Sequence, residues 1–275
     1  MLLWCNGDRK LVVHHHIFKN AGTSIDFLLE RAFPSWENWT AGATAYLGPS
    51  DLAAHLADRE VAALSSHTLR PGAPAGYDVF PIILIRHPLD RAYSVYLHER
   101  RCAPNVLSCH VARVTDFKGY VEWCIDHPSA GGIVIANYQT AHLSTPPWRG
   151  HVYNAVLGEP DLIRATTLLD SLPVAGTVDR FRSFVARLRP ALATWLGRPV
   201  AMPPMAWENW GGEPRIPLGA RVAGLARELG PDLQARFEAA NGYDARLYDH
   251  AVALVGGQDA CEDVEVERPR AMAAL

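Results

Sequence analysis

Residues 11–32 read LVVHHHIFKNAGTSIDFLLERA and contain three local patterns in chain order. The run 11–17 is rich in apolar and β-branched residues, which predicts a strand. Residues 19–23 form a loop of mostly small residues. Residues 24–32 then place apolar side chains at helical spacing, after a hydroxyl residue that can cap the helix. A strand that enters a helix through a short loop is the repeating unit of parallel α/β proteins.

A second unit of the same kind begins at residue 81. The apolar run 81–85 is unbroken, which predicts a strand buried on both faces of a parallel sheet. Arg86, His87 and Pro88 interrupt it, and residues 89–101 follow with a helical pattern. Further along the chain we expect helices at 51–64, 160–172 and 180–196, a helical region at 231–253 that is interrupted at Asn241 and Gly242, and a short strand at 174–177. This alternation predicts an α/β fold with a central parallel sheet and helices on both sides.

The composition is that of a globular protein. The chain has 275 residues, 49% of them apolar, and a formal net charge of −3. We expect one domain over residues 1–257 and a flexible tail over residues 258–275, where the sequence turns acidic and then rich in proline and alanine. The slightly acidic balance argues against a nucleic-acid partner. No apolar stretch reaches about 18 residues, so we expect no membrane span.

The cysteines and the start of the chain bear on the compartment. The five cysteines are scattered and odd in number, and they form no CxxC pair. This usage suits free thiols in a reducing compartment. The first ten residues lack the long apolar core of a secretory signal, so we expect a cytoplasmic protein. No cysteine or histidine pattern has the spacing of a standard metal site, and we expect no metal.

The first loop carries the chemistry of an anion site. A helix N-terminus offers unpaired backbone N–H groups and a partial positive charge, and small side chains let an anion approach them. Lys19 adds a full positive charge, and two hydroxyl residues add donors. In a Walker A loop the lysine follows the glycines, whereas Lys19 precedes Gly22, so this is a different loop. The predicted cradle for a phosphate or sulfate group consists of Lys19, Asn20, Ala21, Gly22, Thr23 and Ser24.

A second anion-binding element follows the second predicted strand. Arg86 comes directly after that strand, at the edge where open α/β sheets bind ligands. Ser94 follows about two helical turns later. A planar guanidinium and a nearby hydroxyl suit a terminal phosphate group. We therefore predict that Arg86 and Ser94 bind a second anionic group of the same ligand.

Both motifs resemble those of sulfotransferases that use 3′-phosphoadenosine 5′-phosphosulfate (PAPS), and most of all the carbohydrate branch that includes heparan sulfate 2-O-sulfotransferases. The first loop of that branch reads roughly H-x-P-K-T-A-G-T-S, and here Phe18 replaces the proline and Asn20 the threonine. The second motif reads I-R-D-P-x-x-R-x-x-S, with His87 here in place of the aspartate. The resemblance implies a P-loop-like three-layer α/β/α fold, a 5′-phosphosulfate site at the first loop, and a 3′-phosphate site at Arg86 and Ser94.

The resemblance also implies a catalytic base and a loop over the nucleotide. In the family a strand end that reads H-x-H supplies the base; His67 matches the second of these histidines, and Ser65 replaces the first. Histidine suits this task because its pKa lies near neutral pH. Asp26 is the alternative base, and Arg215 is a candidate 3′-phosphate ligand from the loop. Arg91 matches the second motif as well, and we expect a structural role for it.

We therefore expect an enzyme that transfers a sulfuryl group from PAPS to a hydroxyl group and releases 3′-phosphoadenosine 5′-phosphate (PAP), with no metal required. Lys19 would stabilise the charge on the transferring group, and His67 would accept the proton. The expected acceptor is a glycan, a glycolipid or a small natural product. Three aromatic residues either stack on it or belong to the core: Phe33, Trp36 and Trp39. Two other functions stay open, a P-loop-type kinase and a non-catalytic protein that binds the phosphoadenosine product.

Overall fold

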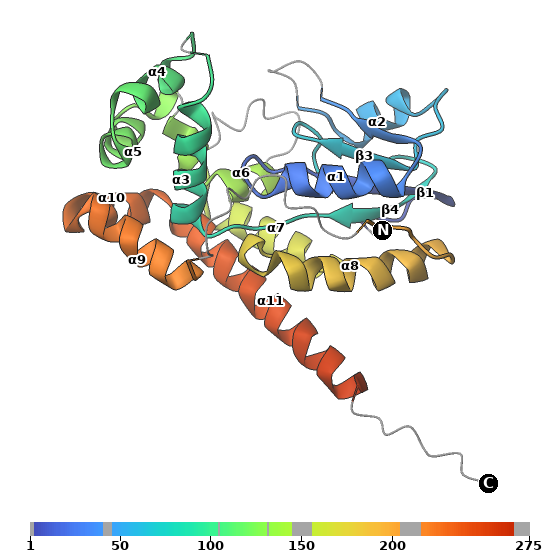
Figure 1. Ribbon diagram of the computed structural model, residues 1–275. Coiled ribbons are helices and arrows are strands. Elements are labelled where there is room, and N and C mark those ends of the chain that lie inside the picture. Colours follow the sequence, from blue (N-terminus) through green and yellow to red (C-terminus); the bar gives the residue numbers. More distant parts are fainter. Residues whose placement is uncertain are drawn as a thin grey trace.

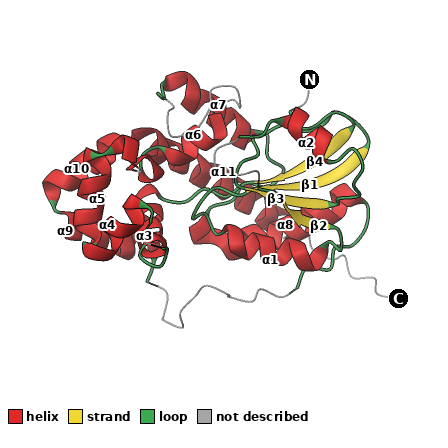
Figure 2. Cartoon of the chain, turned by 90° about the horizontal axis from the view of Figure 1, so that it is seen from above, coloured by secondary structure: helices red, strands yellow, loops and turns green. Residues whose placement is uncertain are grey.

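The computed structural model describes residues 3–40, 46–103, 105–130, 132–144, 156–203 and 216–266. Its centre is a sheet of parallel strands in the order β2-β3-β1-β4 (Figure 1 and Figure 2). The strands are β1 (Arg9–His15), β2 (Trp36–Asn38), β3 (Ala63–Ser66) and β4 (Tyr77–Ile82). Val12 of β1 pairs with Ala63 of β3 on one side and with Phe80 of β4 on the other. The parallel pairing confirms the predicted α/β fold with a central parallel sheet.

Helices make up most of the rest of the described chain. They are α1 (Gly22–Ala32), α2 (Pro49–His55), α3 (Pro88–Glu99), α4 (Leu107–Val114), α5 (Phe117–Asp126), α6 (Tyr138–Ser144), α7 (Glu159–Asp170), α8 (Phe181–Leu196), α9 (Leu218–Leu229), α10 (Pro231–Ala240) and α11 (Gly242–Val266). Short 3₁₀ turns cover Pro128–Ala130, Gly132–Ile135 and Val178–Arg180. Sequence patterns did not predict β2, α4, α5 or α9.

Alternate side chains of β1 enter two different cores, as expected for a strand buried on both faces. Leu11 and Val13 face a core built with α6, α7 and α11, whereas Val12 faces a core built with α1 and α8. All three side chains are at most 1% exposed. The sheet is therefore the middle of three layers, with α1 and α8 on one face and α6 and α7 on the other (Figure 2).

A third core belongs to a group of helices beyond the carboxyl edge of the sheet. Leu89 and Val95 of α3 pack there with Phe117 and Tyr120 of α5 and with Leu225 of α9. Figure 2 shows α3, α4, α5, α9 and α10 gathered at one end of the molecule, away from the strands. Because α3 follows β4 closely, this group forms one wall of the sheet edge at which β1 and β4 end.

The predicted helix over 51–64 is wrong in its second half. The helix α2 ends at His55, and the last two residues of the predicted helix belong to β3. Ala63 and Leu64 are fully buried and pair with β1. This pairing with a distant segment outweighs the local helical pattern, as tertiary context commonly does.

The structure differs from the two later strand predictions in position for the first and in strand pairing for the second. The strand expected at 81–85 is β4, which begins earlier and ends at Ile82. The strand expected at 174–177 does not form a ladder, and Thr177 instead makes an isolated bridge to Ile85. The side chain of Thr177 is fully buried, so the segment still packs beside the end of the sheet.

The last helix is longer than the sequence suggested. α11 continues to Val266, so it enters the segment that was predicted to be a flexible tail from residue 258 onward. Its C-terminal part projects away from the body of the molecule (Figure 1). Among the described helices, none is long and apolar enough to cross a lipid bilayer.

A buried carboxylate joins α11 to the start of α6. Asp244 accepts hydrogen bonds from the backbone amides of Gln139 and Thr140 at 3.1 and 2.8 Å, and from the Thr140 hydroxyl at 2.8 Å. Negative charge at a helix N-terminus satisfies amides that have no partner within the helix. The side-chain oxygen of Asn137 accepts in turn from the amides of Tyr243 and Asp244. These contacts set the position of α6 against α11.

Replacing Asp244 by alanine should lower the free energy of unfolding by about 2–4 kcal/mol, because the buried amides of Gln139 and Thr140 lose a charged acceptor. Urea unfolding followed by circular dichroism measures this loss. Asp249→Ala is the matched control, since Asp249 is exposed on the same helix, and it should change the value by less than about 0.5 kcal/mol. Equal losses for the two variants would show that Asp244 does not hold α6.

Candidate functional site

The two predicted anion-binding segments meet at one edge of the sheet. β1 ends at His15 and leads through the first loop into α1, and β4 ends at Ile82, a few residues before Arg86. Because the two strands are adjacent and parallel, their carboxyl ends lie side by side. The structure brings the two motifs into contact: Nη1 of Arg86 donates to the carbonyl oxygen of Lys19 at 2.9 Å.

The first loop has an uncommon backbone conformation. Lys19 and Ala21 have φ angles of 65° and 61°, in the left-handed region that residues other than glycine rarely adopt. Such strain persists only where the surroundings hold it, and it gathers at functional sites. Among the described residues, none provides an acceptor for the amides of Ala21, Gly22 and Thr23, as expected for a first helical turn. These three amides are available to an anion.

Two of the six predicted cradle residues differ from expectation. The amide of Asn20 donates to the carbonyl oxygen of Ile17, and the amide of Ser24 donates to that of Ala21, each at 3.1 Å. Neither amide is therefore left for a ligand. The side chain of Asn20 is buried and donates to the carbonyl oxygen of Leu84 at 2.7 Å. Asn20 holds the loop in place, and Ser24 can serve an anion only through its hydroxyl.

The side chain of Gln139 on α6 forms hydrogen bonds with both loops. Its side-chain oxygen accepts from Nδ2 of Asn20 at 2.7 Å and from the amide of Arg86 at 2.9 Å. Its side-chain nitrogen donates to the carbonyl oxygen of Arg86 at 2.9 Å. Gln139 is fully buried. This role was not predicted, because no local pattern signals a contact with a partner 119 residues away.

Arg86 shares one buried carboxylate with Arg221. Nε of Arg86 donates to Oδ2 of Asp90 at 2.6 Å, and Nε of Arg221 donates to Oδ1 at 2.5 Å. Burial would raise the pKa of Asp90, but the two guanidinium groups outweigh this effect and lower it. Two arginines on one carboxylate leave a net positive charge, and Arg221 was not predicted. Ser94 is half-buried and lies one turn after Asp90 on the same face of α3.

Lys19 adds to the positive charge at this edge. Burial lowers the pKa of its ammonium group, and the charges of Arg86 and Arg101 lower it further. A lysine whose pKa is lowered by arginines lies in a positive potential. Such a cluster favours a bound anion, which would relieve the repulsion among the cations.

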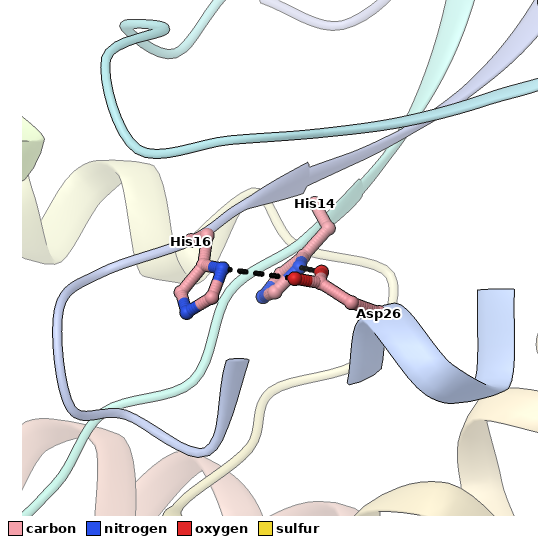
Figure 3. Close-up of side chains that lie close together, drawn as sticks. All are labelled: His14, His16 and Asp26. Atoms are coloured by element: carbon pink, nitrogen blue, oxygen red, sulfur yellow. Dashed lines mark hydrogen bonds and ion pairs between the residues drawn. The ribbon is translucent and has the colours of Figure 1, made fainter. Parts of the chain in front are cut away.

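A cluster of histidines lies beside the first loop (Figure 3). His14 and His16 both face Asp26 of α1: Nδ1 of His14 is 2.8 Å from Oδ1, and Nδ1 of His16 is 3.1 Å from Oδ2. The ring of His67 packs on that of His16, with centroids 3.8 Å apart. The two predicted candidates for the base, His67 and Asp26, therefore both contact His16, for which no catalytic role was predicted.

The surroundings set the charge of this cluster at neutral pH. Burial would raise the pKa of Asp26, but the contacts with His14 and His16 outweigh it and lower the pKa. Asp26 is therefore ionised, and both of its oxygens are engaged, which argues against a role as a free base. Burial and the charge of His16 lower the pKa of His67 from 6.5 to about 4. His67 is therefore neutral at pH 7.

The same cluster has the donor atoms of a metal site. One donor atom from each of His14, His16 and Asp26 lies within 4.8 Å of the other two. Ligands bound about 2.0–2.1 Å from a tetrahedral zinc ion would lie roughly 3.4 Å from one another. The contacts of 2.8 and 3.1 Å to Asp26 are shorter and fall in the hydrogen-bond range. A proton on Nδ1 of His14 accounts for a hydrogen bond to Asp26, whereas Nδ1 of His16 lies within ion-pair distance of Oδ2 without hydrogen-bond alignment. We interpret the cluster as polar contacts of two histidines with one carboxylate.

The three aromatic residues do not act as one surface. Phe33 is 1% exposed and belongs to the core. The indole N–H of Trp36 donates to the hydroxyl of Ser65 at 3.3 Å. Trp39 stacks on His55 with ring centroids 4.2 Å apart. Phe33 is thus not accessible to an acceptor, and the two half-buried tryptophans have separate partners.

Arg91 and Arg215 are the remaining residues for which the sequence predicted a role. Arg91 is buried and donates to the carbonyl oxygens of Phe18, at 3.2 Å, and of Val134, so it ties the first loop to the helical group. These contacts agree with the structural role expected for it. Arg215 lies outside the described residues.

Comparison with known proteins does not assign a function. No protein-family model matches the chain, and no solved structure matches it. An uncharacterized protein of Archaeoglobus fulgidus is 27% identical over 271 residues, which cover 90% of this chain and 98% of that protein. The chain is thus similar to the archaeal protein over most of its length, and any functional conclusion rests on the site itself.

Replacing Gly22 by alanine should displace His16, because a Cβ atom at this position would overlap the His16 ring. Overpacking of this kind lowers the free energy of unfolding by about 1–3 kcal/mol. Denaturant unfolding measures the loss, and NMR should show shifted ring resonances for His16 and His67. Gly224→Ala is the control, since a Cβ there would meet no atom within 4 Å. If Gly22→Ala is as stable as this control and its His16 resonances do not move, His16 does not pack on Gly22.

Proposed function

We propose that this chain is a PAPS-dependent sulfotransferase, which transfers a sulfuryl group from PAPS to a hydroxyl group of an acceptor. The observation that carries the proposal is the pair of loops at the ends of β1 and β4. Gln139 clamps these loops together, and they present Lys19 and Arg86 at one edge of the sheet. PAPS carries two anionic groups, at its 5′ and 3′ positions, and two adjacent cationic loops suit such a ligand.

Each loop has groups for one end of the nucleotide. Lys19, the amides of residues 21–23 and the Ser24 hydroxyl would bind the 5′-phosphosulfate, in the manner of a P-loop-like fold. Arg86 and Ser94 would bind the 3′-phosphate. Asp90 and the carbonyl oxygen of Lys19 engage Nε and Nη1 of Arg86, so among the contacts of the described residues Nη2 is left for the phosphate. Arg215 stays a candidate for the same phosphate.

The proposed reaction is an in-line displacement at sulfur. The acceptor oxygen forms a bond to sulfur while the bond between sulfur and the oxygen of the 5′-phosphate breaks, and the electron pair leaves with PAP. Lys19 and the loop amides stabilise the negative charge that builds on the leaving oxygen. The proton of the acceptor hydroxyl passes to a histidine at the end of the sheet. The family resemblance assigns this role to His67, which is neutral at pH 7, and the scheme uses no metal ion.

The proposed acceptor is a hydroxyl-bearing glycan, glycolipid or small metabolite. The net charge of −3 disfavours a nucleic acid. In the part of the chain that the structure describes, Cys5, Cys102, Cys109 and Cys124 carry free thiols. Free thiols suit a reducing compartment, so we propose that the enzyme works in the cytoplasm.

Calorimetric titration should show that PAP binds at least about tenfold more tightly than ADP or ATP, because PAP alone carries a 3′-phosphate for Arg86 and Ser94. Arg86→Ala should weaken PAP binding by about 100-fold. Arg246→Ala should leave PAP affinity unchanged, since Arg246 is an exposed arginine paired with Glu159.

The other outcomes of this titration separate the alternatives. Tighter binding of ATP than of PAP would contradict the sulfotransferase and favour a kinase. Binding of PAP without any release of PAP from PAPS would favour a non-catalytic nucleotide-binding protein. If none of the three nucleotides binds, the loops do not form a nucleotide site.

Lys19→Ala should slow the release of PAP from PAPS by about 100- to 1,000-fold, because the leaving group loses a preorganised positive charge. Radiolabelled PAPS with water as the acceptor provides the assay. Lys118 is the matched control, since it is exposed on α5, and Lys118→Ala should turn over PAPS like the unmodified protein. A Lys19→Ala variant that keeps the unmodified rate would rule out the proposed chemistry at the first loop.

A further inference from the structure

His16 lies between the carboxylate of Asp26 and the first loop. On one side, its Nδ1 atom is 3.1 Å from Oδ2 of Asp26 (Figure 3). On the other side, its Nε2 atom occupies the space that a side chain at Gly22 would need. Gly22 contributes one of the amides that are available to an anion. The second nitrogen of His16 therefore lies against the part of the loop at which the transferring group would bind.

The negative charge of Asp26 favours a proton on the nitrogen of His16 that faces it, which is Nδ1. An ionised carboxylate only accepts hydrogen bonds, so it favours a proton on a nitrogen that faces it. His14 makes this hydrogen bond through Nδ1, whereas Nδ1 of His16 lies 3.1 Å from Oδ2 without hydrogen-bond alignment. A neutral imidazole with its proton on Nδ1 has a lone pair on Nε2. In this tautomer His16 presents a proton acceptor to the loop. A carboxylate orients the histidine base of serine hydrolases by the same physical arrangement.

We propose that His16, oriented by Asp26, accepts the proton of the acceptor hydroxyl in the sulfuryl transfer, and that His67 positions it. This inference rests on the proposed function and replaces His67 in the role of base. In the step, the bond between the acceptor oxygen and sulfur forms, the bond between sulfur and the 5′-phosphate oxygen breaks, and PAP leaves with the electron pair. The proton moves from the hydroxyl to Nε2 of His16. The charge of Asp26 then balances the imidazolium.

His67 is the weaker proton acceptor of the two. A hydrogen bond between its ring and the backbone of His16 raises its pKa, but burial and the charge of His16 outweigh this effect and lower the pKa to about 4. Burial also lowers the pKa of His16, but the contact with Asp26 opposes this effect. Because the two rings are 3.8 Å apart, a charge on one disfavours a charge on the other. The proton therefore goes to the ring that faces the carboxylate.

The groups that face His16 come from several elements. Asp26 on α1 favours its charged form. His14 on β1 and Lys19 in the first loop disfavour it. His67 after β3 and His142 on α6 also interact with the charge of His16. Of these groups Asp26 alone is negative, so removing its charge should lower the pKa of His16.

His14 supports the same arrangement as a positioning residue. It binds the other oxygen of Asp26 at 2.8 Å, and the same nitrogen lies 3.3 Å from the hydroxyl of Ser65. His14 is 2% exposed, so it is well shielded from solvent. Its contact leaves Oδ2 of Asp26 directed at His16.

The assignment predicts a larger loss of turnover rate when His16 is replaced than when His67 is replaced. With PAPS as donor and water as the acceptor probe, His16→Gln should slow PAP release by about 100-fold or more, the usual contribution of a positioned general base. His67→Gln should slow it by less than about tenfold. PAP affinity should stay within about threefold in both variants. His250→Gln is the control, because His250 is paired with a carboxylate, that of Asp170 at 2.7 Å, but lies on α11.

The pH dependence of Asp26→Asn separates chemistry from folding. Turnover needs a neutral His16, so the rate falls as the pH drops through the pKa of His16. Asparagine removes the negative charge and lowers this pKa, which should move the acid limb of the profile to lower pH. A purely structural defect would reduce the rate at every pH and leave the limb where it was.

NMR of the unmodified protein tests the proposal without a variant. Long-range ¹H–¹⁵N spectra at pH 7 should show the proton of His16 on Nδ1. A proton on Nε2 would overturn the assignment. The assignment would also be wrong if His67→Gln lost as much turnover rate as His16→Gln, or more. An acid limb of the pH–rate profile that does not move in Asp26→Asn would contradict it too. Activity that EDTA removes and zinc restores would point to a metal site instead.

The two proposals fail in different ways. If the unmodified protein does not bind PAP, the sulfotransferase function fails, and the role of His16 fails with it. If the protein binds PAP and His16→Gln releases PAP from PAPS at the unmodified rate, the function stands and only the assignment of His16 is wrong.

Discussion

The side chain of Gln139 bonds to both loops of the site from inside the protein. Its oxygen accepts from Asn20 and from the amide of Arg86, and its nitrogen donates to the carbonyl oxygen of Arg86. Leaving a buried polar atom unpaired costs about 1–3 kcal/mol, so this small network tolerates few rearrangements. Asp244 in turn holds the helix that carries Gln139. The relative position of the two loops, and with it the spacing of their positive charges, depends on this one amide.

Beside each loop, in the helix that follows it, one carboxylate contacts two basic side chains. Asp26 faces two histidines, and Asp90 faces two arginines. The outcome differs because histidine is neutral near pH 7 and arginine is charged. Around Asp26 the proposed result is a neutral imidazole of His16 with its proton on the nitrogen that faces the carboxylate, which would suit proton transfer. Around Asp90 an excess of positive charge remains, which suits the binding of an anion.

Local patterns predicted the parts of the fold whose contacts are local. The units around Lys19 and Arg86 follow from an apolar run, a break and a helical pattern, and both are present. Residues 63 and 64 were misread as the end of a helix, because their partner strand is about 50 residues away and parallel pairing leaves no short-range signal. His67, at the end of this segment, was found only through the family resemblance. Asn20 was assigned to the ligand, whereas burial turned its side chain inward.

The sequence by itself determined which chemical groups stand at each strand end: a lysine and a glycine after the first strand, and an arginine after the second. Short-range spacing is enough for this, since a strand, a turn and a helix cap are encoded within a few residues. Only the tertiary structure decided which groups act together. Gln139 reaches Arg86 across 53 residues, and Arg221 reaches Asp90 across 131. Such contacts cost chain entropy and form only when the whole core has formed, so no local pattern announces them.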